Sequence, residues 1–234
     1  MAADPPGAQP ALQIDDLTYR YPGASEIATR VAALRVAPGE RVLLAGQSGS
    51  GKSTLLHLLA GLIEPTSGSV SINGQDIHAL RGAKRDRFRG RHLGMVFQTF
   101  NLLHGFSAIE NVMAALMFSD RPRSGHRARA GDLLKELGIE RPGAMPDQLS
   151  VGQQQRVAVA RALACEPSVV LADEPTASLD PDNAKAAVDM LQSVCTRHGA
   201  ALVCVSHDPS LNERFERVER LEALGGRALA GGAA

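Results

Sequence analysis

The chain has 234 residues, of which 44% are hydrophobic and 21% are charged, so it is long enough to bury a substantial core. Its 25 basic and 25 acidic residues give a net charge of zero, which argues against the basic excess of most nucleic-acid-binding proteins. The sequence contains no apolar run of the ~18–20 residues that a membrane-spanning helix needs. Cys165, Cys195 and Cys204 match the spacing of neither a zinc site nor a redox pair and are expected to be buried thiols.

The first hundred residues predict a series of short strands. Short runs that alternate or are wholly apolar, bounded by turn-forming residues, are typical of strands. Such runs lie at 14–20, 31–36, 41–45, 67–72 and 93–97. The first two are expected to form a β-rich edge, and Asn73-Gly74 is a turn pair typical of β-hairpins.

Helices are expected to alternate with strands in the rest of the chain. Apolar residues at helical spacing predict helices at 53–62, 109–118, 128–137, 152–163 and 183–198, with further buried strands at 168–172 and 201–206. This alternation predicts an α/β fold with a parallel sheet covered on both faces. The region 101–149, rich in Ala, Leu, Arg and Glu, predicts an inserted helical subdomain within a core of about 11–100 and 150–224, whereas 1–10 and 225–234 are expected to be flexible.

A glycine-rich segment, the phosphate loop, joins the predicted strand at 41–45 to the predicted helix at 53–62. It reads GQSGSGKST and comprises Gly46, Gln47, Ser48, Gly49, Ser50, Gly51, Lys52, Ser53 and Thr54. Glycines let successive backbone N–H groups turn toward phosphate oxygens, and the start of the helix adds a partial positive charge. Lys52 can bring a full charge to the β- and γ-phosphates, and the Ser53 hydroxyl can bind Mg²⁺. The segment therefore predicts a site for a nucleoside triphosphate and magnesium.

Two carboxylates follow the predicted strand at 168–172, in the run VVLADE. Asp173 and Glu174 are expected at the carboxyl edge of the sheet, beside the phosphate loop. Phosphoryl transfer depends on positioning and charge neutralisation more than on covalent chemistry. Asp173 is therefore a candidate for holding the magnesium shell, and Glu174 for polarising the attacking water.

With these two motifs and five further elements in the same order, the chain resembles the nucleotide-binding subunits of ABC (ATP-binding cassette) transporters from about Leu12 to Glu222. The resemblance implies an α/β fold of the P-loop NTPase type, with a RecA-like parallel-sheet core, an antiparallel β edge and an inserted α-helical subdomain. It also implies that the chain binds ATP with Mg²⁺ and hydrolyses the nucleotide.

Two of these elements are expected near the base and the metal. Tyr21, in TYRYPG, matches the aromatic residue that stacks on adenine in this family, with Tyr19 as a competing candidate. Gln98, in MVFQTFNLL, matches the glutamine loop, where the amide reaches the metal and the water and the loop senses the membrane partner. An isolated Gln after a strand carries no signal of its own, so this assignment rests on the resemblance.

The run LSVGQQQR, Leu149 to Arg156, resembles the family's signature motif, usually written LSGGQ. It opens a helix, so its backbone N–H groups and the Ser150 hydroxyl form a second anion site. In the family this site, here Ser150, Gly152 and Gln153, serves the nucleotide held by the opposite subunit. Val151 replaces the first glycine of the motif. A β-branched residue does not readily adopt a positive φ, so either this position has ordinary dihedral angles or the loop is reshaped.

Two elements complete the resemblance. Ser178-Leu179-Asp180, after DEPTA, matches the loop that crosses the dimer interface, where Asp180 is expected to link the two active sites. His207, in VCVSHD, matches the switch histidine that touches the γ-phosphate. The resemblance thus assigns Glu174, His207 and Gln98 to catalysis, and Ser53, Gln98 and Asp173 to the metal.

The resemblance implies that two copies enclose two MgATP and that their closure drives an integral membrane permease. The protein would then lie in the cytoplasm, against the inner face of the cell membrane, and would not bind nucleic acid. Four residues are candidates either for contacts with the permease or for the core of the helical subdomain: Met113, Leu116, Met117 and Phe118.

Three alternatives from other classes fit the sequence less well. A translation or DNA-repair ATPase of the same family would carry two cassettes or long coiled coils, and a small-molecule kinase would not carry the LSVGQQQR run. A regulatory subunit without catalysis would not be expected to keep Lys52, Asp173, Glu174 and His207 together. Among transporters, the short length and the MVFQTFNLL and LSVGQQQR segments look most similar to the lipoprotein-releasing and macrolide-export subgroup, with the cell-division cassette and amino-acid importers as competing matches.

Overall fold

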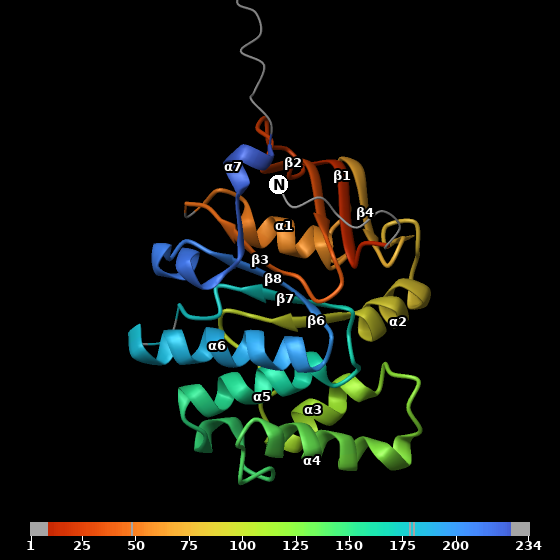
Figure 1. Ribbon diagram of the computed structural model, residues 1–234. Coiled ribbons are helices and arrows are strands. Elements are labelled where there is room, and N and C mark those ends of the chain that lie inside the picture. Colours follow the sequence, from red (N-terminus) through yellow and green to blue (C-terminus); the bar gives the residue numbers. More distant parts are fainter. Residues whose placement is uncertain (1–8, 48, 178, 180, 226–234) are drawn as a thin grey trace, which may run out of the picture.

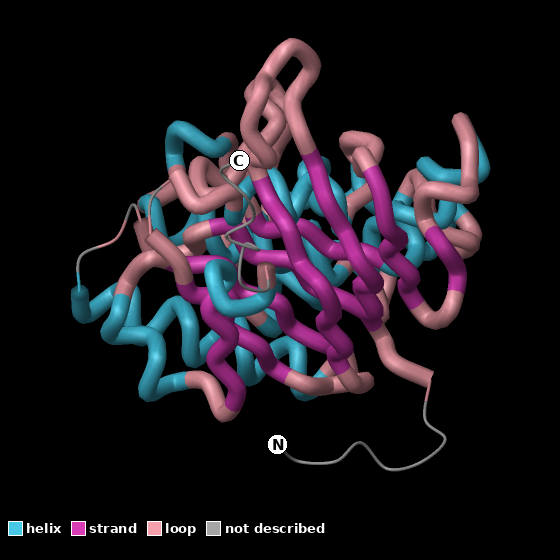
Figure 2. Tube along the Cα trace, turned by 90° about the horizontal axis from the view of Figure 1, so that it is seen from above, coloured by secondary structure: helices cyan, strands magenta, loops and turns pink. Residues whose placement is uncertain are grey.

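The computed structural model describes residues 9–47, 49–177, 179 and 181–225 (Figure 1). One sheet is antiparallel, with the order β2-β1-β4-β5, and consists of β1 (Leu12–Tyr19), β2 (Thr29–Val36), β4 (Ser67–Ile72) and β5 (Gln75–Asp76). The other is parallel, with the order β6-β7-β8-β3-β9, and consists of β6 (Leu93–Val96), β7 (Val169–Asp173), β8 (Ala201–Ser206), β3 (Arg41–Ala45) and β9 (Arg217–Arg220). Figure 2 looks down onto the antiparallel sheet, which lies over the rest of the molecule.

Helices lie between the two sheets, on the far face of the parallel sheet and at the margins of the molecule (Figure 1). They are α1 (Lys52–Leu59), α2 (Ala83–His92), α3 (Ala108–Leu116), α4 (His126–Glu136), α5 (Val151–Leu163), α6 (Pro181–Arg197) and α7 (Leu221–Leu224). Short 3-10 helices lie at Arg123–Gly125, Pro146–Gln148 and Pro209–Arg214. Helix α1 lies between the two sheets, whereas α6 and the group α3, α4 and α5 lie on the opposite side of the parallel sheet.

Strand β3 shows how the parallel sheet serves two hydrophobic cores. Successive side chains of a strand point to opposite faces. Val42 and Leu44 join the core that contains α1 and the antiparallel sheet. Leu43 joins the core that contains α3 to α6. Because both faces are covered, the central residues Val42, Leu43 and Leu44 are all apolar rather than alternating with polar residues.

Helix α5 connects the other two helices of its group, α3 and α4, to the parallel sheet. It packs against α3 and α4 and also against β6. A capping box starts α3, in which the Ser107 backbone N–H donates to Glu110 at 2.8 Å. Buried residues from these three helices share one core with Val170 and Leu202 of the sheet. Motion of α5 relative to the sheet would therefore have to repack this core.

The predicted parallel core and antiparallel edge are both confirmed. The strands predicted at 41–45 and 201–206 have those bounds, and Asn73 and Gly74 both have positive φ, at 47° and 72°, in the turn between β4 and β5. The sequence did not predict α2, β9 or α7. Helix α2 buries none of its residues, so it lacks the apolar stripe on which a helix prediction depends.

The cysteines behave as ordinary core residues. Cys195 and Cys204 are buried, and Cys165 is half-buried. Burial raises the pKa of the Cys165 thiol to about 11 and that of Cys195 to about 12, so these two thiols stay protonated near neutral pH. Within the described part of the chain, no helix combines the length and the apolar character needed to cross a bilayer.

Candidate functional site

The phosphate loop connects the carboxyl end of β3 to the start of α1. Gly49 and Gly51 have positive φ, at 81° and 88°. A Cβ on Gly51 would lie 2.3 Å from the Ala28 carbonyl oxygen, so only glycine fits there. The loop therefore ends on a helix N-terminus whose N–H groups are available to an anion.

Lys52 is buried at the start of α1 and lies back over this loop. Its Nζ donates hydrogen bonds to the carbonyl oxygens of Gly46, at 3.0 Å, and Gln47, at 2.7 Å. It also lies 3.6 Å from the Glu174 Oε1 atom. A buried ammonium group is costly unless it is paired, and these contacts hold the charge within the site.

Ser53 and Asp173 bring two oxygen donors together beside the loop. The Ser53 hydroxyl donates to Asp173 Oδ1 at 3.2 Å. Burial raises the pKa of Asp173, the Ser53 hydrogen bond opposes the rise and the nearby Glu174 charge adds to it. Mg²⁺ in phosphate sites takes one or two side-chain oxygens of this kind, together with the substrate phosphates. The donor set therefore fits magnesium.

Glu174 follows β7 directly and is held by residues from the end of β8. The Ser206 hydroxyl donates to its Oε2 atom at 2.9 Å, and the backbone N–H of His207 donates to the same atom at 3.3 Å. The His207 Nδ1 atom lies 2.8 Å from Oε1. Glu174 itself has a positive φ of 44°. The carboxylate is thus buried, close to Lys52 and held in one orientation. A positioned carboxylate can accept a proton from a water molecule within hydrogen-bond reach.

The structure distinguishes the two tyrosines. Tyr19 is 9% exposed and belongs to the core, whereas Tyr21 is 48% exposed. Their rings meet edge to face with centroids 4.9 Å apart. The Tyr21 hydroxyl lies 2.8 Å from the Thr54 hydroxyl, at the phosphate loop. Tyr21 therefore offers an accessible ring face near the loop, and Tyr19 does not.

Gln98 lies at the same edge of the sheet. Strand β6, which it follows, runs parallel to β7 with Val96 opposite Ala172. Gln98 therefore comes just after β6 where Asp173 and Glu174 come at the end of β7. Its side chain is exposed.

Ser150, Gly152 and Gln153 lie at the N-terminus of α5. Ser150 caps the helix: its hydroxyl accepts the Gln153 N–H at 3.3 Å, and the Gln153 side chain accepts the Ser150 N–H at 3.0 Å. Val151 is the first residue of the helix, is 46% exposed and has no positive φ. The altered signature residue therefore adopts ordinary helical dihedral angles, and the loop before the helix need not be reshaped.

Comparison with known proteins agrees with this site. The model of the family described as ABC transporter matches residues 30–177. The chain belongs to the ABC transporter family. It is 42% identical over 215 residues to the lipoprotein-releasing system ATP-binding protein LolD 1 of Rhodopirellula baltica, covering 89% of this chain and 94% of that protein. It is 41% identical to the macrolide export ATP-binding/permease protein MacB of Syntrophobacter fumaroxidans, covering 90% of this chain but only 30% of that larger protein.

A solved structure of a related cassette extends the comparison. The cassette MJ0796, in a dimeric post-hydrolysis state bound to ADP and Pi, matches with a TM-score of 0.79 and 36% identity, covering 90% of this chain and 94% of that one. The predicted ABC fold is confirmed. The chain is an ATP-binding and ATP-hydrolysing subunit of the ABC type, similar to the lipoprotein-release and macrolide-export members.

Ser48 of the phosphate loop, and Ser178 and Asp180, which the ABC resemblance assigned to the dimer interface, lie outside the described residues. For the described signature residues Ser150, Gly152 and Gln153, no hydrogen bond or ion pair reaches the phosphate loop. The structure therefore brings the phosphate loop, Asp173, Glu174 and His207 together and leaves the signature residues apart from them.

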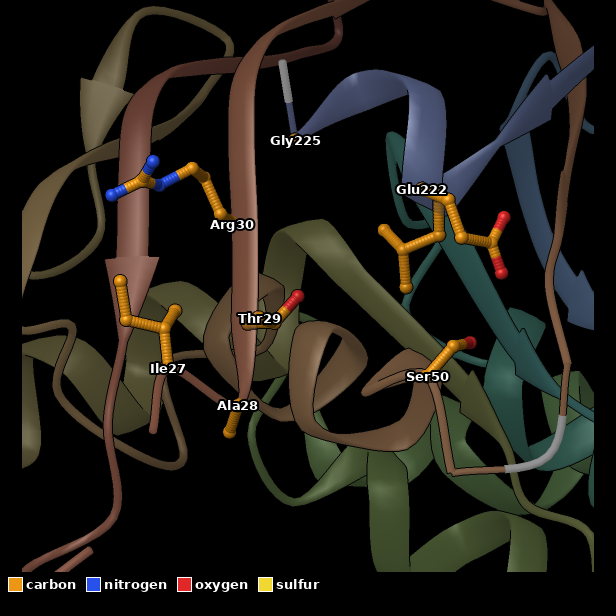
Figure 3. A pocket seen from close by; sticks show the side chains of 8 residues that line it. Ile27, Ala28, Thr29, Arg30, Ser50, Glu222 and Gly225 are labelled. Carbon is orange, nitrogen blue, oxygen red and sulfur yellow. The ribbon is translucent and has the colours of Figure 1, made fainter. Parts of the chain in front are cut away.

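Two residues beside the site escaped the sequence analysis. Ser206 orients Glu174, and only its position before His207 hinted at this. Glu222 on α7 accepts the Gln47 N–H at 3.3 Å. Figure 3 shows the cavity of about 320 Å³ next to this contact, where Ser50 and Thr29 carry buried hydroxyl oxygens without a partner among the described residues. Ordered water fits groups of this kind.

Proposed function

We propose that two copies of this cassette enclose two MgATP, and that their closure drives a membrane permease. Each nucleotide would lie between the phosphate loop of one copy and Ser150–Gly152 of the other. The observation that carries the proposal is the exposed, capped N-terminus of α5, whose N–H groups can bind an anion. Among the described residues, no hydrogen bond joins this N-terminus to the phosphate loop of its own chain. The dimeric state of the related cassette MJ0796 supports it.

The contacts of each residue indicate its role in nucleotide binding. Lys52 would exchange its two carbonyl contacts for the phosphates, and Tyr21 would stack on the base. Ser53 and Asp173 would hold Mg²⁺, with Gln98 nearby. Magnesium would neutralise phosphate charge during transfer.

Hydrolysis would use the oriented carboxylate of Glu174. A water molecule attacks the γ-phosphorus, the bond to the β–γ bridging oxygen breaks, and the water proton passes to Glu174. His207 would contact the γ-phosphate from its exposed ring, which already lies against Glu174. Asp180 would link the two sites across the interface. Loss of the γ-phosphate removes the charge that both copies share, and the dimer reopens.

The permease would dock on the helical segment. Leu116 is fully buried and Met113 packs against the core, so these two belong to the interior. Met117 and Phe118 are each 54% exposed at the end of α3, and large exposed apolar side chains of this kind mark contact surfaces. The permease would hold the protein on the inner face of the cell membrane. The similarity of this chain to LolD and MacB favours a transporter of the lipoprotein-release or export type.

The test is the mass of Glu174→Gln protein in solution, measured by light scattering with MgATP, with MgADP and without nucleotide. The substitution keeps the shape of the side chain and removes the proton acceptor, so bound ATP should persist. We expect a dimer with ATP and a monomer in the other two conditions. A Glu174→Gln, Lys52→Met double variant should stay monomeric with ATP, because it cannot hold the phosphates. A monomer in all conditions, for a protein that binds ATP, would contradict the sandwich.

A further inference from the structure

The turn that follows Gln98 holds two consecutive residues in an uncommon backbone conformation. Phe100 and Asn101 have φ values of 58° and 46°. Residues with a Cβ rarely adopt this region, and such strain persists only where surrounding contacts impose it. Locally, the Asn101 N–H donates to the Thr99 carbonyl at 2.7 Å, and the Thr99 hydroxyl donates to the Asn101 side chain at 2.8 Å. The Phe100 side chain is 5% exposed and fixed in the core.

One side chain from another element binds this turn. The Arg161 guanidinium donates to the Asn101 carbonyl at 2.5 Å and to the Phe100 carbonyl at 2.7 Å. Its planar fork fits two neighbouring acceptors at once, which an ammonium group cannot reproduce. The backbone conformation of the turn aims both carbonyls at the same place. The strained residues and the arginine therefore form one unit.

Arg161 carries its charge in a partly desolvated place. Burial lowers its pKa, and no carboxylate contributes to the shift. A guanidinium group stays charged in proteins, so the two carbonyls of the turn are its compensation. Burying a charged group costs free energy, which simple packing of the turn would not require. The two hydrogen bonds of Arg161 specify one position of the turn relative to α5.

The same helix carries the signature residues. Arg161 lies ten residues after Val151, which is about 15 Å along a helix. A continuous helix of this length moves as a rigid element. The turn after Gln98 and the N-terminus of α5 are thus joined by one helix and one bidentate contact.

We propose that Arg161 is a positioning residue that couples the glutamine loop to the signature end of α5. The proposal rests on the ATP sandwich proposed above. In that arrangement Gln98 serves the nucleotide of its own chain, whereas Ser150–Gly152 serve the nucleotide of the other copy. Arg161 therefore links two steps: the binding of a nucleotide in its own chain and the positioning of the site that serves the nucleotide of the other copy. Linkage between two sites requires such a connection.

The experiment measures ATP-driven dimerisation in the Glu174→Gln background. Arg161→Met keeps the length of the side chain and removes both hydrogen bonds, whereas Arg161→Lys keeps the charge and reaches one carbonyl. We expect the ATP concentration at half-dimerisation to rise about tenfold for Arg161→Met and by less for Arg161→Lys, from a typical coupling between sites. The Kd for ATP of the monomer should stay within about twofold, because the phosphate loop is untouched.

Arg85→Met is the matched control. Arg85 also donates to two backbone carbonyls, those of Leu80 at 2.9 Å and His78 at 3.2 Å, and in addition pairs with Glu64 at 2.7 Å, but it contacts neither site. We expect Arg85→Met to lower the Tm, because it removes these bonds, without moving the half-dimerisation concentration. A purely structural role of Arg161 would give the same pattern for Arg161→Met, a lower Tm and an unchanged half-dimerisation concentration, and would overturn the inference.

The outcomes separate this inference from the proposed function. If Glu174→Gln dimerises with ATP and adding Arg161→Met leaves that dimerisation unchanged, the coupling role is wrong and the sandwich stands. If Glu174→Gln itself stays monomeric with ATP, the sandwich fails and the inference fails with it. A rise for Arg161→Met, a smaller rise for Arg161→Lys and none for Arg85→Met support both.

Discussion

Under the proposed function the carboxyl edge of the parallel sheet and the N-terminus of α5 would both bind phosphate, but they are built in opposite ways. At the sheet edge, Lys52 and Glu174 are buried and each has several partners within the chain. At α5, Ser150 and Gln153 are exposed or half-exposed, and the hydrogen bonds that their side chains make within the described part of the chain join them to each other. The groups of the first site are held by contacts within one chain, whereas the second would receive its nucleotide from the other copy of the proposed dimer.

The difference follows from where charge is buried. A buried ammonium or carboxylate must be compensated at once, so the sheet edge could not form without its internal contacts. The free N–H groups of a helix N-terminus in solvent are hydrogen-bonded by the capping residue and by water, so the helix end is stable without a bound partner. Variants at the two sites should therefore fail in different ways.

The largest effect is expected at the sheet edge. Lys52→Met removes the charge that would meet the phosphates and leaves Glu174 with one cation fewer. We expect kcat to fall by about 10²–10³-fold, as for loss of one preorganised donor, measured by phosphate release. The control is Lys84→Met, because Lys84 is exposed on α2. Turnover within a few-fold of wild type in Lys52→Met would mean that the loop does not hold the phosphates.

At the α5 site, activity and stability should separate. A Cβ on Gly152 would have no atom within 4 Å, so a side chain fits there. Gly152→Asp puts a negative charge in the first turn, which favours the helix but repels a phosphate. We expect ATP-driven dimerisation to be lost and ATPase activity to fall about 100-fold, with an unchanged or higher Tm.

The control for Gly152→Asp is Gly143→Asp. Gly143 is exposed and also has open space around a Cβ, but it lies outside both sites. It should retain wild-type turnover. A loss of Tm in Gly152→Asp that matches its loss of activity would argue against a binding role.

Asp173 offers a test of the burial cost at the sheet edge. Its folded-state pKa lies above its ordinary value, mainly because of burial. The ionised carboxylate therefore destabilises the folded state, by an amount that grows as the pH rises from the ordinary pKa to the folded-state pKa. Asp173→Asn is neutral at every pH and can still accept the Ser53 hydroxyl.

We therefore expect nucleotide-free Asp173→Asn protein to melt about 1–3 °C higher than wild type at neutral pH. The gain should shrink as the pH falls through the folded-state pKa and vanish below about pH 3, where the wild-type carboxyl is protonated in both states. MgATP hydrolysis by this variant should be lost, because the carboxylate proposed to hold Mg²⁺ is gone. Calorimetry across the pH range checks the first expectation. A gain that grows as the pH falls would contradict the assigned direction of the pKa shift.

Features that depend on neighbouring residues could be predicted from the sequence, whereas contacts between residues far apart in the sequence could not. The phosphate loop and the VVLADE run each carry their chemistry within a few residues, so the sequence identifies them. Arg161, Ser206 and Glu222 act on residues 60, 32 and 175 positions away, and no periodicity encodes such a contact. The choice between Tyr19 and Tyr21 was also open in the sequence, because only burial separates them.

Val151 gives the smallest expected effect and the finest test of the comparison. It is the first residue of α5, with ordinary helical dihedral angles and 46% exposure. Val151→Gly therefore relieves no strain and only loosens the first turn of the helix. We expect ATPase activity within about twofold of wild type and a Tm lower by roughly 1 °C. A large rise in activity would mean that the branched side chain obstructs the second copy, and that the α5 site awaits its partner in an impaired form.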